Sequence, residues 1–180
     1  MEPSKYQVTA SLRDGANIII RAIRPDDRDS MRQQFVRLSP ESVRFRFHGA
    51  RHSPSESEAM YLTEIDFVEH VALVATLATP LEQVIGVGRY IVCDNGPKHH
   101  RAEIAFVVLD QYQGKGIGSL LVQHLALIGR TQGIREFQAD VLADNHRMID
   151  VFEHSGFPIR RSTELGVVRL LLTILDQQTG

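Results

Sequence analysis

The pattern of apolar and polar positions divides the chain into alternating strands and helices. Residues 1–17 are polar and lack a clear period, which predicts an arm or a loose first strand. An apolar run at 18–23 then indicates a buried strand, and 25–38 is expected to be helical because its leading proline suits a first helical turn. A second short helix is expected to open at 39–42, and residues 56–64 again show a helical pattern.

The middle of the chain predicts three antiparallel strands in succession. Two β-rich runs, at 71–77 and 84–92, are separated by a short proline-containing turn, which is typical of a hairpin. A turn at 94–97 leads to a third run at 102–109. The three runs therefore predict a meander.

The second half of the chain predicts a helix followed by a mixture of both elements. Residues 116–130 carry apolar side chains at i, i+3 and i+4, the spacing of a helix packed on a sheet. A strand at 136–142, a helix at 145–154 and two strands near 158–163 and 167–175 follow. The element order predicts a mixed α/β fold.

Composition narrows the class of protein. With 180 residues, 43% of them hydrophobic, the chain can bury one core, and we expect a single domain over 18–180 after the arm. The net charge of −2 gives no electrostatic reason to expect nucleic acid as a partner. No run of about 18 apolar residues occurs, so no membrane association is expected. The lone Cys93 excludes an internal disulfide and favours a reducing compartment, by default the cytoplasm.

Two groups of side chains bear on function. Eight arginines lie within residues 21–51 against four acidic residues, which indicates either a solvated helix face or a basic wall that meets an acidic substrate or a cofactor phosphate. Among the eight histidines, His99 and His100 are adjacent in a turn and the others lack ligand spacing. No metal site is expected.

The most informative segment is the glycine-rich turn Gln113-Gly114-Lys115-Gly116-Ile117-Gly118, between a predicted strand and a predicted helix. Without side chains at the three glycines, successive backbone N–H groups can point at an anion, and the helix N-terminus adds partial positive charge. A pyrophosphate is the expected occupant. Alternatively, the glycines serve only a tight turn and a close contact between helix and strand.

Two familiar phosphate loops do not fit this turn. A P-loop places lysine directly before Ser or Thr, whereas Ser119 follows Gly118. The dinucleotide fingerprint G-x-G-x-x-G follows the first strand of a parallel βαβ unit, but here G-x-G-x-G follows a meander. Nucleoside triphosphates and nicotinamide cofactors are therefore disfavoured.

The turn and a later segment together resemble the GNAT N-acetyltransferase superfamily. Gln113, Gly116 and Gly118 match the family's phosphate motif, Gln/Arg-x-x-Gly-x-Gly/Ala, and the segment 145–157 looks like its later motif, an Asn that opens a helix ending in Gly-Phe. The resemblance covers about residues 18 to 175. It implies a mixed α/β, α+β-like GNAT fold: a central, mostly antiparallel sheet with flanking helices and a splay between the family's fourth and fifth strands. It also implies acetyl-CoA as the acetyl donor.

More narrowly, three segments resemble the Pat-like protein lysine acetyltransferases: 38–47, 62–66 and 102–108. Within the third segment, Glu103 matches the catalytic glutamate of those enzymes. A protonated amine is not a nucleophile, so the reaction needs a base near the thioester, and Glu103 is the candidate. We expect apolar strand neighbours to raise its pKa toward neutrality. The alternative is a surface carboxylate on a half-exposed strand.

The resemblance also implies the remaining contacts with acetyl-CoA. The backbone of Phe106 and Val108 is expected to run along the pantetheine arm, where one N–H could hold the developing oxyanion. Lys115 and Ser119 are expected to reach phosphate oxygens, although Lys115 could equally be solvated. Asn145 either caps the following helix or contacts the cofactor.

Phe152 departs from the family pattern, because many members carry a Tyr there that protonates the departing thiolate. Phenylalanine has no proton to give. Either the thiolate leaves unaided and takes a proton from water, or another group such as Ser155 or Tyr112 helps. Phe152 is also expected to pack in the core, one turn after Met148.

These observations predict an N-acetyltransferase that moves acetyl from acetyl-CoA to an amine by direct transfer, with a lysine on a protein as the expected acceptor. Two alternatives fit the same sequence: an enzyme that acetylates a small amine, and a non-catalytic acyl-CoA-binding sensor. Glu103 argues against the sensor.

Overall fold

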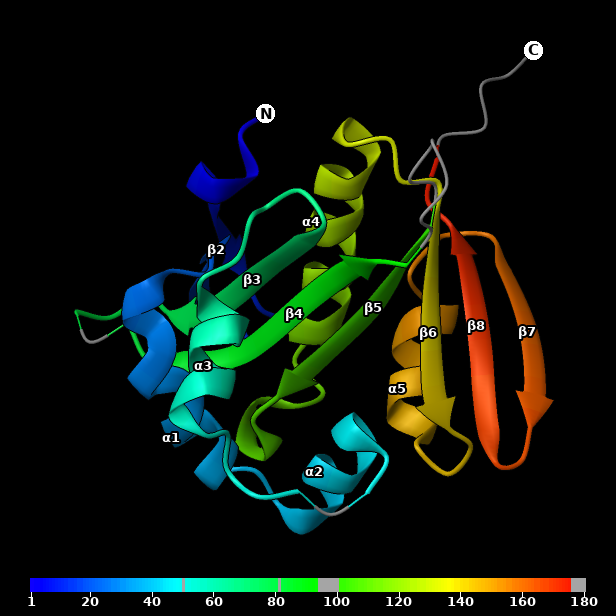
Figure 1. Ribbon diagram of the computed structural model, residues 1–180, viewed down its shortest axis with the longest axis horizontal. Coiled ribbons are helices and arrows are strands. Elements are labelled where there is room, and N and C mark those ends of the chain that lie inside the picture. The colour runs from blue at the N-terminus through cyan, green and yellow to red at the C-terminus, as the bar shows by residue number, and fades with distance from the viewer. Residues whose placement is uncertain (50, 81, 94–100, 176–180) are drawn as a thin grey trace.

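Within residues 1–49, 51–80, 82–93 and 101–175, which the computed structural model describes, eight strands form one sheet in the order β1-β2-β3-β4-β5-β6-β8-β7 (Figure 1). The strands are β1 Gln7–Ser11, β2 Asn17–Ala22, β3 His70–Leu77, β4 Val84–Val92, β5 Arg101–Val108, β6 Glu136–Leu142, β7 Ile159–Glu164 and β8 Val167–Thr173. The expected turn at 94–97, His99 and His100 lie outside the described residues.

The structure also contains helical elements. They are the α-helices α1 Arg28–Val36, α2 Pro40–Phe47, α3 Glu56–Thr63, α4 Ile117–Thr131 and α5 His146–Glu153, and the 3-10 turns η1 Pro3–Lys5, η2 Pro25–Asp27 and η3 Asp110–Tyr112. The order and type of the elements agree with the sequence pattern from residue 17 onward. Residues 1–17 were expected to form an arm or a loose first strand, and the second alternative is found, because β1 pairs with β2 along its whole length.

The sheet is mostly antiparallel. The predicted meander is confirmed, because β3, β4 and β5 pair in succession as antiparallel neighbours. The exception is β5 with β6, which is parallel and is paired at only three positions, Arg101–Glu103 against Glu136–Gln138. Beyond Glu103 the two strands diverge (Figure 1). This is the splay expected between the family's fourth and fifth strands. In this chain these two strands are numbered β5 and β6, because the numbering here counts β1 as the first strand.

Helices cover both faces of the sheet. The larger core lies under α4 and α5, where Leu121, Leu125 and Phe152 pack on even-numbered β5 residues such as Phe106. A smaller core lies on the other face, where Met31 of α1 packs against residues of β3 and β4. The side chains of β5 therefore alternate between the two faces, as a strand buried on one side requires.

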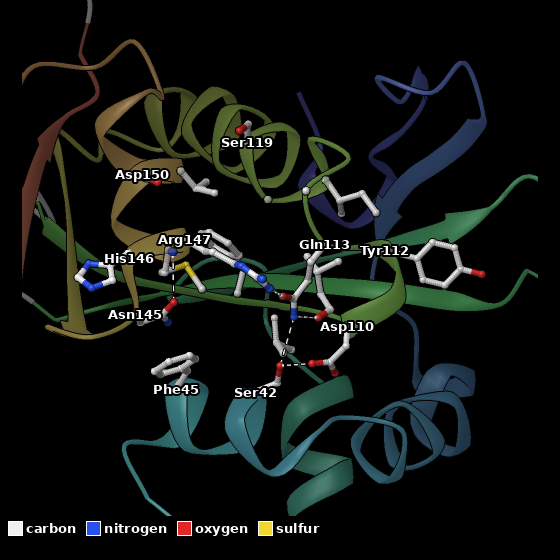
Figure 2. Close-up of a pocket in the computed structure, with 18 of the residues that line it drawn as sticks. Ser42, Phe45, Asp110, Tyr112, Gln113, Ser119, Asn145, His146, Arg147 and Asp150 are labelled. Carbon is white, nitrogen blue, oxygen red and sulfur yellow. Dashed lines mark hydrogen bonds between the residues drawn. The ribbon is translucent and has the colours of Figure 1, made fainter.

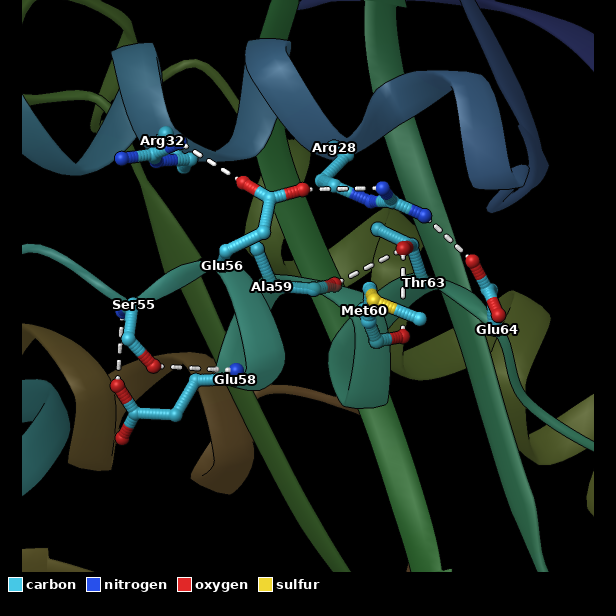
Figure 3. A network of polar contacts seen from close by, with 9 residues as sticks. All are labelled: Arg28, Arg32, Ser55, Glu56, Glu58, Ala59, Met60, Thr63 and Glu64. Carbon is cyan, nitrogen blue, oxygen red and sulfur yellow. Dashed lines mark hydrogen bonds and ion pairs between the residues drawn. The ribbon is translucent and has the colours of Figure 1, made fainter.

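An ion-pair network joins α1 to α3 on the second face (Figure 3). Glu56 of α3 accepts hydrogen bonds from Arg28 and Arg32 of α1, each at 3.0 Å, and Glu64 pairs with Arg28. Ser55 caps α3 through a reciprocal capping box with Glu58. The network aligns two short helices that contribute few apolar contacts of their own.

The arginines of residues 21–51 do not form a continuous basic wall. Five of them pair with acidic side chains: Arg21, Arg28, Arg32, Arg44 and Arg51. Most of the run is thus engaged in ion pairs on helix faces. Arg46 differs, because it lines the cleft described next.

Candidate active site

A cleft of about 1050 Å³ opens where β5 and β6 part. Its walls are α2, the second half of β5, the glycine-rich turn with the start of α4, and α5 (Figure 2). Nine of the residues predicted for the site line it: Phe106, Val108, Gln113, Gly114, Gly116, Ile117, Gly118, Ser119 and Asn145. The structure therefore brings the two sequence motifs together at one cleft.

The glycine-rich turn presents unpaired backbone donors to this cleft. Gly116 is the N-cap of α4 and has φ +96°, and Gly114 has φ +76°, a region that side-chain-bearing residues rarely adopt. The helix begins without a side-chain cap. Within the described residues, the N–H groups from Gly114 to Ser119 donate no hydrogen bond. Such a cradle of N–H groups at a helix N-terminus suits a diphosphate.

Gly118 has a different reason to be glycine. A Cβ atom at this position would lie 2.8 Å from Cε2 of Phe106 and 3.4 Å from Cγ1 of Val151. At this position α4 therefore packs closer to β5 than a residue with a side chain would allow. The close packing that was the alternative interpretation of the turn is therefore found at Gly118, whereas the anion cradle at Gly114 and Gly116 stays a prediction.

The free backbone groups of β5 face the side that β6 has left. Leu109 N–H donates to Ile85 O (2.9 Å), so the odd-numbered residues at this end of β5 bond to β4. In an antiparallel pair the alternate residues point the other way. The N–H and C=O groups of Phe106 and Val108 are therefore directed toward the cleft, and Val108 O indeed accepts from Gln113 Nε2 at 3.0 Å.

A hydrogen-bond network ties α2 to the turn (Figure 2). Asp110 accepts from the hydroxyls of Ser39 (2.7 Å) and Ser42 (2.8 Å), and Gln113 Nε2 donates to Ser42 Oγ at 3.2 Å. Burial raises the pKa of Asp110, but the hydrogen bonds from Ser39 and Ser42 outweigh it and hold that pKa below its usual range. Arg147 of α5 completes the network by donating to Gln113 Oε1 (3.2 Å).

The α5 side of the cleft combines structural and exposed groups. Asn145 is buried and caps α5 by accepting from Met148 N–H at 3.2 Å, so the structural alternative for this residue is realised. Phe152 is also buried, and its ring lies 5.3 Å from that of Phe106, which confirms the expected core packing. It borders a small pocket that Arg46 also lines and that shares several lining residues with the cleft.

Glu103 lies outside the cleft lining, at the fork itself. It is the last residue of β5 that pairs with β6, opposite Gln138. Its side chain is exposed on the α2 face, while its strand neighbours Ala102 and Ile104 are buried on the other face. The expected apolar surroundings are therefore absent, because period-2 alternation turns those neighbours away from the carboxylate.

Arg46 supplies part of the electrostatic surroundings of Glu103 instead. Burial lowers the pKa of Arg46, and attraction to Glu103 opposes that shift. On the same face, burial and the charge of Arg46 lower the pKa of Arg89 to about 9. Arg89 donates to His70 Nε2 at 2.9 Å.

Two further predicted groups have other positions. Lys115 does not line the cleft, and its amine lies 2.8 Å from Asp14 Oδ2. Ser155 is buried, and its hydroxyl accepts from Phe157 N–H rather than facing the cleft. Tyr112 does line the cleft.

Several cleft residues were not assigned to the site from the sequence, although Arg46 belongs to the arginine run at 21–51 and Ser42 to the Pat-like segment 38–47. Arg13, Ser42, Arg46, Asp110 and Arg147 line the cleft from four different segments. Only the tertiary fold brings them to the turn.

Within the described residues, no group of three or more His, Cys, Asp or Glu could hold a metal ion. No helix in that part of the chain is long and apolar enough to cross a membrane.

Residues 38–157 match the acetyltransferase (GNAT) family model. The chain belongs to the GNAT acetyltransferase family. GNAT acetyltransferases use acetyl-CoA, and the turn with its free N–H groups fits the diphosphate of that donor. The family match spans α2 through α5 and so includes nearly every wall of the cleft.

Known proteins resemble the chain over most of its length. An acetyltransferase of Pseudomonas aeruginosa is 33% identical over 155 residues, covering 86% of this chain and 82% of that protein. The acetyltransferase Pat of Mycolicibacterium smegmatis is 33% identical over 161 residues, covering 89% of this chain but 47% of that protein. The crystal structure of the GNAT domain of S. lividans PAT superposes with a TM-score of 0.85 at 35% identity, covering 93% of this chain and 96% of that one.

Proposed function

We propose that this GNAT enzyme transfers acetyl from acetyl-CoA to the ε-amine of a protein lysine, with Glu103 as the general base. The observation that carries the proposal is the position of Glu103, the last paired residue before β5 and β6 diverge. A base at the fork is close to where a thioester held between the strands would present its carbonyl.

The donor half of the proposal uses the turn and β5. The N–H groups of 114–119 bind the diphosphate, and the pantetheine arm runs between the diverging strands. The N–H of Phe106 is directed to that side and would stabilise the oxyanion as negative charge develops on the thioester oxygen. Gln113 has a positioning role, because its amide group already forms hydrogen bonds with Ser42, Val108 and Arg147.

The acceptor half uses the α2 face. The ammonium gives a proton to Glu103, and the neutral amine attacks the thioester carbon. The C–S bond then breaks to release the thiolate, and the nitrogen loses its extra proton to water to give the amide. Phe152 has no proton to give and Ser155 is buried, so the thiolate takes a proton from water or from Tyr112, which lines the cleft. Arg46 borders the same small pocket as Phe152, and its positive charge would stabilise the departing thiolate.

A lysine acceptor is supported by the relationship to proteins named Pat and PAT and by the Pat-like segments 38–47, 62–66 and 102–108. The exposed position of Glu103 also suits an acceptor on the surface of another protein. A cytoplasmic location is part of the proposal and is supported by the lone Cys93.

Thiol release tests the proposal. The enzyme is incubated with acetyl-CoA and, in parallel, with lysine-containing peptides, the same peptides with arginine for lysine, and a panel of amino acids and polyamines. Release that requires the peptide lysine supports the proposal. Release only with small amines would assign the enzyme to a small-molecule substrate, and binding of acetyl-CoA without release on any acceptor would indicate a sensor.

A further inference from the structure

A loop from the N-terminal hairpin closes one side of the donor cleft. The loop joins β1 to β2 and is anchored by Leu12, which is buried in the larger core. Arg13 N–H donates to Lys115 O (3.2 Å), and Asp14 Oδ2 lies 2.8 Å from Lys115 Nζ. The hairpin thus holds the glycine-rich turn through one backbone hydrogen bond and one ion pair. It precedes the residues, 38–157, that match the family model.

The side chain of Arg13 extends over the turn. A Cβ atom built on Gly116 would lie 3.6 Å from Arg13 Nε, and Arg13 lines the cleft. Within the residues that the structure describes, its guanidinium makes no hydrogen bond or ion pair. The adjacent carboxylate, Asp14, is engaged by Lys115. Beside the turn, the positive charge of Arg13 therefore remains available to the cleft, whereas Asp14 offsets the charge of Lys115.

This placement is electrostatically unfavourable unless an anion is present. The first turn of α4 carries partial positive charge on its unpaired N–H groups, and a cation is favoured at the opposite end of a helix. An anion between Arg13 and these N–H groups would reverse the sign of the interaction. A diphosphate is suited to this position, because a guanidinium matches phosphate oxygens in geometry as well as charge.

We propose that Arg13 binds the diphosphate of CoA from the side opposite the N–H groups of the turn. The proposal rests on the proposed function, since it requires the turn to hold that diphosphate. It makes the N-terminal hairpin part of the donor site. Lys115 then has a positioning role, because it holds the hairpin on the turn through Asp14.

Calorimetric titration tests this role with two ligands, CoA and 3′-dephospho-CoA, which keeps the diphosphate but lacks the 3′-phosphate. Arg13→Gln should weaken the affinity for both ligands by about 10- to 100-fold, the loss expected for a charge-assisted hydrogen bond. Arg13→Lys keeps the charge and should recover part of the loss. Arg24→Gln is the matched control: Arg24 is exposed, contacts Gln7 and does not line the cleft, so its affinities should stay within about twofold.

The other outcomes separate this inference from the proposed function. A loss with CoA that disappears with dephospho-CoA would place Arg13 on the 3′-phosphate and overturn the diphosphate assignment. A further variant, Gly116→Asp, tests the turn itself. If Gly116→Asp binds CoA much more weakly while the affinity of Arg13→Gln is unchanged, the role of Arg13 is overturned and the turn remains the diphosphate site. Absence of CoA binding by the unaltered enzyme would overturn both. Thermal unfolding of each variant shows that it is folded.

Discussion

At the scale of single residues, the chemistry depends on which way each side chain of β5 points. Even-numbered residues pack under α4, and odd-numbered ones face α2. Glu103 therefore shares its face with Arg46 and Arg89 and not with the apolar core. In the proposed mechanism, the exposed Glu103 is accessible to an amine from outside, whereas the thioester would approach from the cleft.

Glu103→Gln keeps the shape of the side chain and removes the base. We expect a loss of about 10²- to 10⁴-fold in the rate of acetyl transfer near neutral pH. The loss should shrink as the pH rises toward ~10.4, where lysine deprotonates in solution without help. Rates measured from pH 7 to 10 check this.

The affinity for acetyl-CoA is the control for this variant, because the turn lies elsewhere and should bind the donor as before. A variant within about threefold of the unaltered enzyme across the pH range would show that Glu103 is only a surface carboxylate.

Gly118→Ala should disturb the contact between α4 and β5. The added Cβ would lie 2.8 Å from Phe106, whose ring is buried against Phe152 and cannot move freely. We expect a loss of about 1 to 3 kcal/mol in the free energy of unfolding, as for overpacking in a core, together with weaker CoA binding. Urea unfolding and calorimetry measure the two effects.

Ser119→Ala on the next residue removes a partly exposed hydroxyl without adding an atom, so its stability should be close to that of the unaltered protein. Full stability of Gly118→Ala would mean that α4 can move away from β5 at little cost.

At the scale of elements, two kinds of ion pair hold the helices of the α1 face, and they should differ in strength. Glu56 joins α3 to α1 but is 58% exposed, whereas Asp27 pairs with Arg21 at 2.7 Å and both side chains are under 10% exposed. Water screens the first pair and not the second.

Replacing either carboxylate by its amide tests this difference. Asp27→Asn should lower the free energy of unfolding by roughly 3 to 5 kcal/mol, because it leaves the Arg21 charge buried with less compensation. Glu56→Gln should cost less than about 1 kcal/mol. Urea unfolding of both variants measures the contrast. Equal losses would mean that the network between α1 and α3 is stronger than its exposure indicates.

The elements themselves could be predicted from residue 17 onward because their periodicity is local. β1 was less distinct, since it is an edge strand without a buried residue, and its pattern of exposed and half-buried positions resembles that of an arm. Within the site, the turn could be predicted because its residues are consecutive. Arg13 and Asp110 could not, because their contacts with Lys115 and Ser42 join segments that are far apart in the sequence.

At the scale of the whole molecule, acid should weaken the fold before most carboxylates titrate. Arg89 always donates, so its partner His70 Nε2 must accept and the ring is neutral. Burial, and then the charge of Arg89, lower the pKa of His70 to about 4. The unfolded chain takes up this proton near pH 6.5 and the folded chain only near 4.

The contribution of His70 is therefore fully present above about pH 6.5 and is lost as the pH falls toward 4, by about 3 kcal/mol in total. His70→Gln keeps an acceptor for Arg89 and removes the titration, so it should flatten the fall of stability in this range. Urea midpoints between pH 8 and 4 for both proteins make the comparison. An unchanged slope would mean that His70 is protonated in the folded protein at a higher pH.

The short ladder between β5 and β6 has a consequence for the lifetime of the enzyme as well as for its chemistry. Three pairs of residues join the first five strands to the last three, and the free edge of β5 beyond them lacks a strand partner. A pantetheine arm lying there would act as a substitute strand that only the folded chain can accept. By mass action, donor at 100 times its dissociation constant would add about 2.7 kcal/mol to stability. The small unfolded fraction, on which proteases act, would then grow as the supply of acetyl-CoA falls, so that starvation for the donor would increase proteolysis of the enzyme at the same time as it slows the reaction.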